Sequence, residues 1–245
     1  MKTLKSCRDI TVIENTPYIV IATDSSGSIG EKEGDHLHVK TEIAAAHCLR
    51  VCLNEIYAVG ATPDIIISTV SNEFDVTGVK ILEGIRELCQ RYHITDYEIN
   101  GSSEENFPTT MTGFGITVVG NAKELRWQKT LEGDYCYLYG WPFVGKEVLE
   151  NEDDLLNPLI IHSLFNKYDI HDFLPCGSGG IINEIEVLCE DTKLNFMQES
   201  LVEDSDPQIL YRSAGPSTCG IFTTAEKIKE KDIQLIGYFT ETEEE

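Results

Sequence analysis

Basic residues are scarce in this sequence. It has 19 Lys and Arg against 42 Asp and Glu, which gives the 245-residue chain a formal net charge of −23. Nucleic-acid backbones and anionic membrane surfaces both favour basic patches, so we expect neither as a partner. A phosphorylated ligand would need a local inversion of charge, and a Mg²⁺ ion held by carboxylates provides one.

Long apolar runs are also missing. The longest, YIVIA and DIIIST, fall far short of the ~20 residues that a membrane-spanning helix needs. The N-terminal stretch MKTLKSCRDI has no continuous apolar core after its lysines, so we expect no secretory signal. These absences predict a cytoplasmic protein.

Closely spaced metal-binding pairs are absent too. None of the eight cysteines stands in a C-x-x-C pair, and without a secretory signal we expect no disulfide framework. Cys48 and Cys52 lie four apart in a helical pattern and are interpreted as small buried hydrophobes. His36 and His38 share a strand face but have no third nitrogen or sulfur ligand nearby, so a structural role is favoured over a metal site.

The order of elements predicts an α+β fold. A domain boundary is expected near Lys129, giving domains 1–129 and 130–245. The first domain has predicted strands at 18–23, 36–40, 64–70, 95–100 and 113–122, and helices at 41–60 and 79–92. The second has predicted strands at 131–140, 193–197 and 233–240, a loop leading into a strand within 213–224, and helices at 156–169, 181–190 and 225–231.

One stretch, YLYGWPFVGKE, contains the G-x-x-x-x-G-K skeleton of a phosphate-binding P-loop. Such a loop needs Ser or Thr after the lysine, because that hydroxyl ligates Mg²⁺, and here the residue is Glu147. Pro142 removes a backbone N–H, and Trp141 and Phe143 crowd the approach of a phosphate. We therefore interpret the motif as a coincidence.

A more suitable loop is DSSGSIGEKEGD. Gly27 and Gly30 allow backbone N–H groups to converge on an anion, and Lys32 offers a point charge to phosphate. Asp24, at the end of a strand, is a candidate metal ligand, and Asp35 closes the loop. The alternative is a surface hairpin with turn glycines and solvated charges.

Two further segments concentrate carboxylates and amides. Asn54 and Glu55 stand late in the long helix, where a carboxylate is costly to bury unless it is paired or bound to a metal. Glu104, Glu105 and Asn106 crowd a loop between strands, where adjacent carboxylates repel each other unless a cation separates them. Oxygen ligands of this kind suit Mg²⁺. The alternatives are an exposed helix face and a solvated turn.

Four segments resemble those of the AIR synthase-like superfamily, which contains aminoimidazole ribonucleotide synthetase and thiamine-monophosphate kinase. They are TDSSGSIGEK, LNEIYAVGATP, NGSSEENFPTTMTGFGITVVGNA and GSGGIINEI, in the family's order and over nearly the whole chain. DSSGSIGEKEGD, GSSEENFP and SAGPSTC together resemble α-ribazole kinase, which phosphorylates a nucleoside used in cobalamin assembly. Glu55 replaces the usual helix aspartate, and Gly177–Gly179 lacks the carboxylate of the thiamine kinase.

The resemblance implies a mixed N-terminal domain that pairs through a β-barrel in a homodimer, and an α+β C-terminal domain. It also implies ATP and Mg²⁺ as cofactors and a small-molecule nucleoside as substrate. The residues it suggests are Asp24, Glu55, Glu104 and Glu105 for the metal, Gly27, Gly30, Lys32, Asn54, Asn106, Gly177, Gly179 and Gly180 for the nucleotide, and Asp24, Asp35 or Glu105 for accepting the hydroxyl proton.

Three functions follow as alternatives. The first is a nucleoside kinase, because Lys and Arg are few and a neutral acceptor needs few basic contacts. The second is an ATP-dependent ligase that activates an amide, which would act on a phosphorylated substrate and need more basic contacts. The third is a nucleotide-binding partner without catalysis, which the replaced aspartates would explain.

Overall fold

The computed structural model describes residues 2–4, 10–199 and 207–241. The chain divides into two compact units. The first comprises Met1–Ile56 and Ala61–Glu124, and the second Tyr57–Gly60 and Leu125–Glu245. Lys129, near which the sequence predicted the boundary, thus lies inside the second unit. No helix among the described residues is both long enough and apolar enough to cross a membrane.

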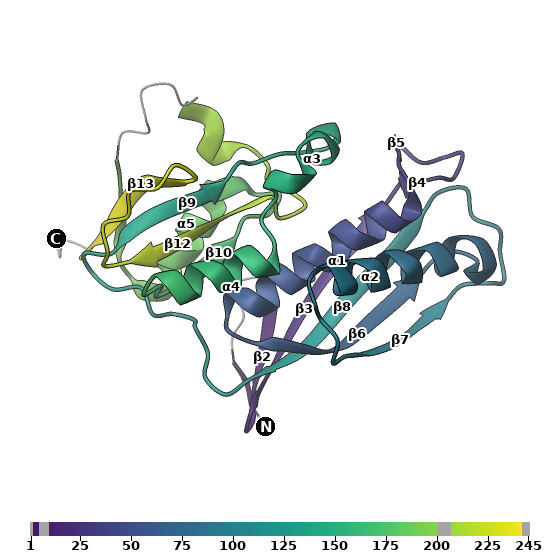
Figure 1. The fold of residues 1–245 in the computed structure, drawn as a ribbon, viewed down its shortest axis with the longest axis horizontal. Helices are drawn as coiled ribbons and strands as arrows, with labels where there is room; N and C mark the ends of the chain where they lie inside the picture. Colours follow the sequence, from purple (N-terminus) through teal and green to yellow (C-terminus); the bar gives the residue numbers. More distant parts are fainter. Residues whose placement is uncertain (1, 5–9, 200–206, 242–245) are drawn as a thin grey trace. The chain divides into compact units, whose positions relative to one another are not determined.

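The first unit is built on a sheet with strand order β1-β2-β3-β8-β6-β7 (Figure 1). Neighbouring strands are antiparallel except β6 and β7, which are parallel. The strands are β1 (Lys2–Leu4), β2 (Ile10–Glu14), β3 (Tyr18–Gly27), β6 (Thr62–Val70), β7 (Glu98–Ser103) and β8 (Gly113–Ala122). A small parallel pair, β4 (Ile29–Gly30) with β5 (Leu37–His38), replaces the longer strand predicted at 36–40.

Two helices cover one face of this sheet, α1 (Thr41–Ala58) and α2 (Val79–Arg91), the latter preceded by a π-helix, η1 (Phe74–Gly78) (Figure 1). In β8 the buried residues alternate strictly with half-buried ones, as expected for a sheet with one covered face. The helices approach closely at Gly84, where an added Cβ would lie 2.2 Å from the Glu42 carbonyl oxygen. This explains a glycine in the middle of α2.

The other face of the sheet carries apolar side chains that are only partly buried. Ile21, Val119 and Ile65 lie side by side in register across β3, β8 and β6, and Ile65 is 39% exposed. Ile13 and Ile19 extend this row to β2. The described sheet is open and forms no closed barrel by itself.

The second unit has a mixed architecture around a sheet with order β10-β12-β9-β13-β11, antiparallel throughout. Its strands are β9 (Tyr135–Gly140), β10 (Phe173–Pro175), β11 (Asn195–Gln198), β12 (Cys219–Thr224) and β13 (Ile233–Thr240). Its helices are α3 (Lys146–Glu150), η2 (Glu152–Asp154), α4 (Pro158–Lys167), α5 (Gly180–Thr192) and η3 (Pro207–Tyr211).

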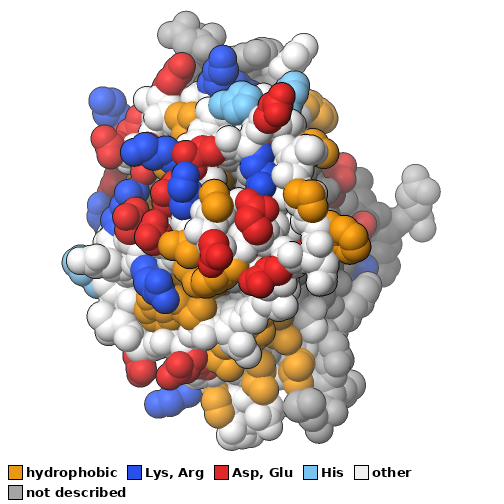
Figure 2. Space-filling model, turned by 90° about the vertical axis from the view of Figure 1, so that its right-hand side faces the viewer, with side chains coloured by type: hydrophobic (Ala, Val, Ile, Leu, Met, Phe, Trp, Pro, Cys, Tyr) orange, Lys and Arg blue, Asp and Glu red, His pale blue; other side chains and the backbone are white. Residues whose placement is uncertain are grey.

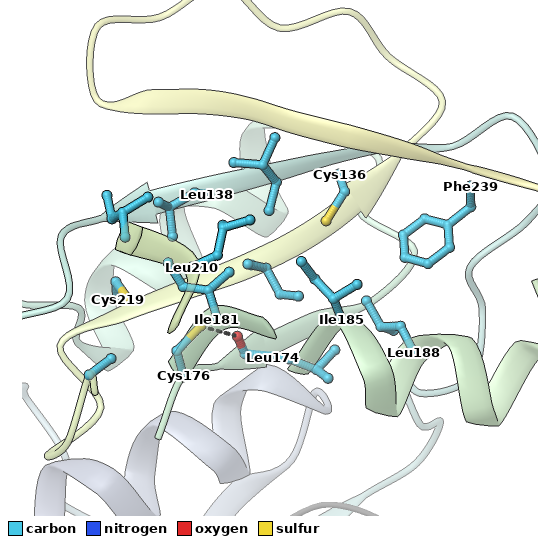
Figure 3. Packing of buried hydrophobic residues seen from close by; sticks show 14 residues of the cluster. Cys136, Leu138, Leu174, Cys176, Ile181, Ile185, Leu188, Leu210, Cys219 and Phe239 are labelled. Atoms are coloured by element: carbon cyan, nitrogen blue, oxygen red, sulfur yellow. Dashed lines mark hydrogen bonds between the residues drawn. The ribbon is translucent and has the colours of Figure 1, made fainter. Parts of the chain in front are cut away.

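Both faces of the central part of this second sheet are covered. On one face Ile181, Ile185 and Leu188 of α5 pack against strand residues such as Leu138, and Figure 3 shows this cluster. On the other, side chains of α4 pack with aromatic residues of β9, β10 and β12. Every residue of β12 (CGIFTT) is therefore buried, and the strand shows no alternation of apolar and polar residues.

Some local predictions were wrong. Residues 225–231 form turns rather than the predicted helix, because Ile228 N–H donates to the Tyr137 hydroxyl and Glu226 N–H donates to Thr224 Oγ1. A seven-residue helix gains too little from its own hydrogen bonds to resist such contacts. Strand β2 and helix α3 were missed, and β7 continues to Ser103 into the predicted loop.

Candidate functional site

Asp24 of β3 and Glu55 of α1 both lie near Cys52 of α1. Asp24 is half-buried and Glu55 is 6% exposed, and the Cys52 thiol donates to the Ile116 carbonyl oxygen at 3.3 Å. Burial raises the pKa of the Cys52 thiol, and the negative charges of Asp24 and then Glu55 raise it further. Both carboxylates therefore affect the same thiol, in a part of α1 that also buries the polar side chains of Arg50 and Asn54.

Cys48, one turn earlier in α1, also faces Asp24. Burial raises the pKa of the Cys48 thiol well above its ordinary value, and the charge of Asp24, to which the thiol is hydrogen-bonded, adds to the shift. Cys48 and Cys52 are thus buried thiols, as predicted, and Cys48 is in addition hydrogen-bonded to the Asp24 side chain. Asn54 is fully buried beside this group.

Lys32 forms an ion pair with Glu73, a residue that the sequence analysis did not single out. The Lys32 Nζ lies 2.7 Å from Glu73 Oε1 and 3.2 Å from the Thr109 carbonyl oxygen. Thr77 Oγ1 also donates to Glu73 Oε1 at 2.9 Å. Burial alone would raise the pKa of Glu73, but the hydrogen bond from Lys32 and the other donors outweigh it and lower the pKa to about 2. A phosphate would have to compete with this ionised carboxylate for Lys32.

Asp35 holds the predicted phosphate loop in shape. It is 5% exposed and accepts hydrogen bonds from Thr112 N–H and Thr112 Oγ1 at 2.7 Å, and from Lys32 N–H at 2.8 Å. Burial would raise the pKa of Asp35, but the hydrogen bonds from Thr112 outweigh it and lower the pKa. Its contacts are those of a structural carboxylate, and its part in catalysis stays a prediction.

The two glycines of this loop have different environments. A Cβ on Gly30 would lie 2.3 Å from Thr112 Oγ1 and 2.9 Å from Asp35 Oδ2, so Gly30 is required by close packing. Gly27, at the end of β3, is exposed and has nothing within 4 Å of the position of a Cβ. Of the two, Gly27 is the one whose surroundings leave room for a ligand.

Glu104, Glu105 and Asn106 follow β7 and are exposed. Their contacts are local: Asn106 N–H donates to Glu104 Oε1 at 2.7 Å, and Ser103 Oγ donates to Glu105 Oε1 at 3.0 Å. The hydrogen bond from the Asn106 backbone lowers the pKa of Glu104. The segment has the contacts of a solvated turn, and its metal role stays a prediction.

The glycine loop of the second unit leads into α5. Gly180 has φ +79°, and a Cβ there would lie 2.9 Å from the Arg212 carbonyl oxygen, so a side chain is excluded. Gly177 accepts hydrogen bonds at its carbonyl oxygen from the backbone N–H groups of Gly180 and Ala214. Gly179 is exposed at the start of the helix. The loop is ordered by the backbone around it, and its ligand contacts stay predicted.

The P-loop-like stretch is occupied by protein groups. Phe143 N–H donates to Thr218 Oγ1 at 3.0 Å and Val144 N–H donates to Glu147 Oε2 at 3.3 Å, while the Glu147 carboxylate pairs with Arg212. Two of the loop's N–H groups are thus already bonded within the protein, which agrees with the interpretation from sequence.

The structure therefore brings some of the predicted residues together and not others. Asp24 and Glu55 both lie near Cys52, whereas the side-chain hydrogen bonds of Glu104 and Glu105 are to residues of their own turn. Among the described residues, no group of three or more His, Cys, Asp or Glu side chains is arranged to hold a metal ion. On the face in Figure 2, Lys and Arg are interspersed with Asp and Glu without a continuous basic surface.

Comparison with known proteins gives the fold. Neither a protein-family model nor a curated protein matches this sequence. Among solved structures, thiamine monophosphate kinase from Aquifex aeolicus matches with a TM-score of 0.67 at 17% identity, covering 95% of this chain and 89% of that one. The fold is AIR synthase-like. Another structure of similar extent, AaThiL complexed with AMPPCP and TMP, matches with a TM-score of 0.66 at 16% identity, covering 96% of this chain and 85% of that one.

Two further structures support the same assignment of fold. HypE from E. coli has a TM-score of 0.64 at 13% identity, covering 91% of this chain and 80% of that one. PurL from T. maritima, complexed with ATP, has a TM-score of 0.58 at 12% identity, covering 95% of this chain and 37% of that one. The resemblance inferred from the four sequence segments is thus confirmed for the superfamily fold.

Proposed function

We propose that this chain is an ATP- and Mg²⁺-dependent small-molecule kinase whose acceptor is a nucleoside, with α-ribazole as the first candidate. The observation that carries the proposal is that Asp24 and Glu55, two of the four positions that the resemblance suggested for metal, both lie near the buried Cys52 thiol and raise its pKa. The similar ThiL structure that holds AMPPCP and TMP supports ATP as the donor.

The donor set fits Mg²⁺. Mg²⁺ prefers oxygen ligands and is usually held by one or two carboxylates together with substrate phosphates, so a complete cage of protein ligands is not needed. Asp24 and Glu55 would supply those carboxylates, and the bound ion would neutralise phosphate charge. The half-buried position of Asp24 against α1 limits its movement, which suits a ligand that must be ready before the nucleotide arrives.

The chain's own residues would mainly position the reactants. Phosphoryl transfer has a loose transition state, so catalysis depends on alignment and on neutralising charge. Lys32 would move from Glu73 towards a phosphate, and Gly27 leaves its backbone open to one. Glu105, Asp24 and Asp35 remain the candidates for accepting the hydroxyl proton, with Asp35 the most constrained because its two oxygens accept three hydrogen bonds.

The test is incubation with Mg-ATP and a panel of α-ribazole, thiamine phosphate and common nucleosides, followed by mass spectrometry for a gain of phosphate. We expect one nucleoside to gain phosphate with production of ADP, and EDTA to abolish the reaction. If thiamine phosphate were the only compound to gain a phosphate, it and not a nucleoside would be the acceptor. ATP binding without ADP production across the panel would favour a non-catalytic partner instead.

The ligase alternative predicts that ADP formation depends on a different substrate. ADP would form only when an amide-containing phosphorylated substrate is present, and the product would lack the added phosphate. The scarcity of Lys and Arg argues against it, because a phosphorylated substrate needs additional basic contacts. A cytoplasmic location and a homodimer paired through the open face of the first sheet belong to the same proposal.

A further inference from the structure

A hollow of about 320 Å³ lies in the first unit, between the β6–β7 edge of the sheet and α2 with its π-helix. Its volume falls at the small end of the range for ligand pockets, which suits one ring system rather than a peptide or a second chain. Its lining combines apolar side chains, such as Leu82 and Phe74, with polar groups on β6 and β7. None of the residues predicted from sequence lines it.

One polar group in this hollow lacks a partner. Ser68 is 2% exposed, its side chain lines the hollow, and its Oγ has no hydrogen-bond partner in the part of the chain that the structure describes. A buried hydroxyl without a partner costs free energy, so its retention needs an explanation. A ligand with a polar edge would satisfy it.

The wall opposite carries an aromatic ring and a cation. Phe74 is 39% exposed, and its ring is held against Gly78, where an added Cβ would lie 2.8 Å from a ring carbon. π-helical turns occur frequently at functional sites, and here the π-helix is the element that presents the ring. Arg86 is exposed at the same hollow, and no acidic side chain among the described residues forms an ion pair with it. In a chain with net charge −23, most cations are expected to pair with a carboxylate, so an arginine with no acidic partner among the described residues is a candidate ligand contact.

We infer that this hollow binds the planar heteroaromatic base of a nucleoside. Phe74 would stack on the ring, Arg86 would lie over its face or donate to its ring nitrogens, and Ser68 would bond to its edge. A free phosphate is disfavoured, because Ser103, which lines the hollow, donates to Glu105 and so brings a carboxylate to its rim. The inference rests on the proposed function for its choice of ligand, since both ATP and the acceptor carry such a base.

The experiment measures binding separately from turnover. Adenosine and α-ribazole are titrated by calorimetry into the wild-type chain and into Phe74→Ala and Arg86→Gln, with Val76→Ala as the matched control. Val76 belongs to the same π-helix, is 61% exposed and does not line the hollow. We expect both test variants to weaken binding of one nucleoside at least about 5-fold, from the loss of stacking or of the cation, and the control to leave it unchanged.

The results assign the base or overturn the inference. Weakened binding of adenosine alone assigns the hollow to the base of ATP, and weakened binding of α-ribazole alone assigns it to the acceptor. Wild-type affinity in both variants, or no binding of either nucleoside to the wild type, overturns the inference. Circular dichroism of Phe74→Ala checks the fold, and Arg86→Gln tests the hollow at an exposed position.

The same variants separate the two proposals. Binding of adenosine that depends on Phe74, in a chain that never transfers phosphate, would overturn the kinase and leave the hollow standing. Transfer of phosphate by Phe74→Ala and Arg86→Gln with wild-type KM for both substrates would overturn base binding in the hollow and leave the kinase proposal standing.

Discussion

The Lys32–Glu73 pair shows how single residues order the site. Glu73 was not among the residues chosen from the sequence, because its partners Lys32, Thr77 and Thr109 lie 41, 4 and 36 positions away. Its neighbour Asn72 is 1% exposed and donates to Thr109 Oγ1 at 2.6 Å. The segment is therefore held at two consecutive residues, by the hydrogen bond of Asn72 and the ion pair of Glu73. A local signal for this role would be the polar SNEFD run directly after a buried strand.

Glu73→Gln tests this pair through pH. Because the folded pKa of Glu73 is lowered to about 2 from 4.5, its ionisation stabilises the fold above pH 4.5, and that contribution is lost as the pH falls towards 2. After allowing for partial exposure of both side chains, we expect the variant to be less stable by roughly 1–2 kcal/mol at pH 7. Denaturant unfolding of both proteins at pH 7, 4.5 and 3 should show the difference shrinking; a constant difference would contradict the assigned ionisation.

Asp24→Asn tests the candidate metal site. Removing the charge while keeping the shape should lower turnover with Mg-ATP at least about 10-fold and raise the Mg²⁺ concentration needed for half-maximal rate. Asp64→Asn is the matched control, since Asp64 is an exposed carboxylate of β6 bonded to Asn121 Nδ2 at 2.8 Å. Steady-state kinetics and a thermal melt of each variant provide the measurement. Unchanged activity at saturating Mg-ATP would remove Asp24 from the mechanism.

At the scale of elements, loops far apart in sequence form one polar assembly. Asp35, in the turn before β5, bonds to Thr112 directly before β8, and Glu31 Oε2 accepts from the N–H of Thr41 at 3.2 Å and from its hydroxyl at 3.1 Å. The start of α1 is thus capped by the Glu31 carboxylate, which follows β4 in sequence. Lys80 of α2 completes this contact at 2.6 Å from Glu31.

The two loop glycines separate a packing role from a binding role. Gly30→Ala should destabilise the chain by about 1–3 kcal/mol, because its Cβ would strike Thr112 Oγ1 in a well-packed network. Gly27→Ala should change stability by no more than about 0.5 kcal/mol, since nothing lies within 4 Å. If Gly27 contacts a phosphate, its variant should raise the KM for ATP while keeping its melting temperature. A wild-type KM for Gly27→Ala would remove that contact from the proposal.

At the scale of the whole molecule, the open face of the first sheet is where a second copy is expected. Ile65→Lys should convert the proposed homodimer to a monomer, because a charge would be placed in the middle of the Ile21–Val119–Ile65 row. Size-exclusion chromatography with light scattering measures this, with Met197→Lys, an exposed residue of β11, as the control. A wild-type chain that is monomeric at all concentrations would exclude the homodimer.

What the sequence determined by itself was largely local. Long elements with strong periodicity, such as α1 and β8, were predicted at nearly their observed positions, and four ordered segments were enough to identify the superfamily fold. Charge composition argued against nucleic acid and anionic membranes as partners, and Glu147 with Trp141, Pro142 and Phe143 argued against a P-loop. Each of these depends on neighbouring residues, whose spacing along the chain is also their spacing in space.

The tertiary structure alone decided which distant side chains meet. It joined Asp24 to Cys48 and Cys52, gave Lys32 the partner Glu73, and left Glu104 and Glu105 in their own turn. It also placed Phe74 and Arg86 beside Ser68 in one hollow. Hydrogen bonds and packing across strands depend on register and on which face of the sheet a helix covers, and neither is written in the spacing of residues along one segment.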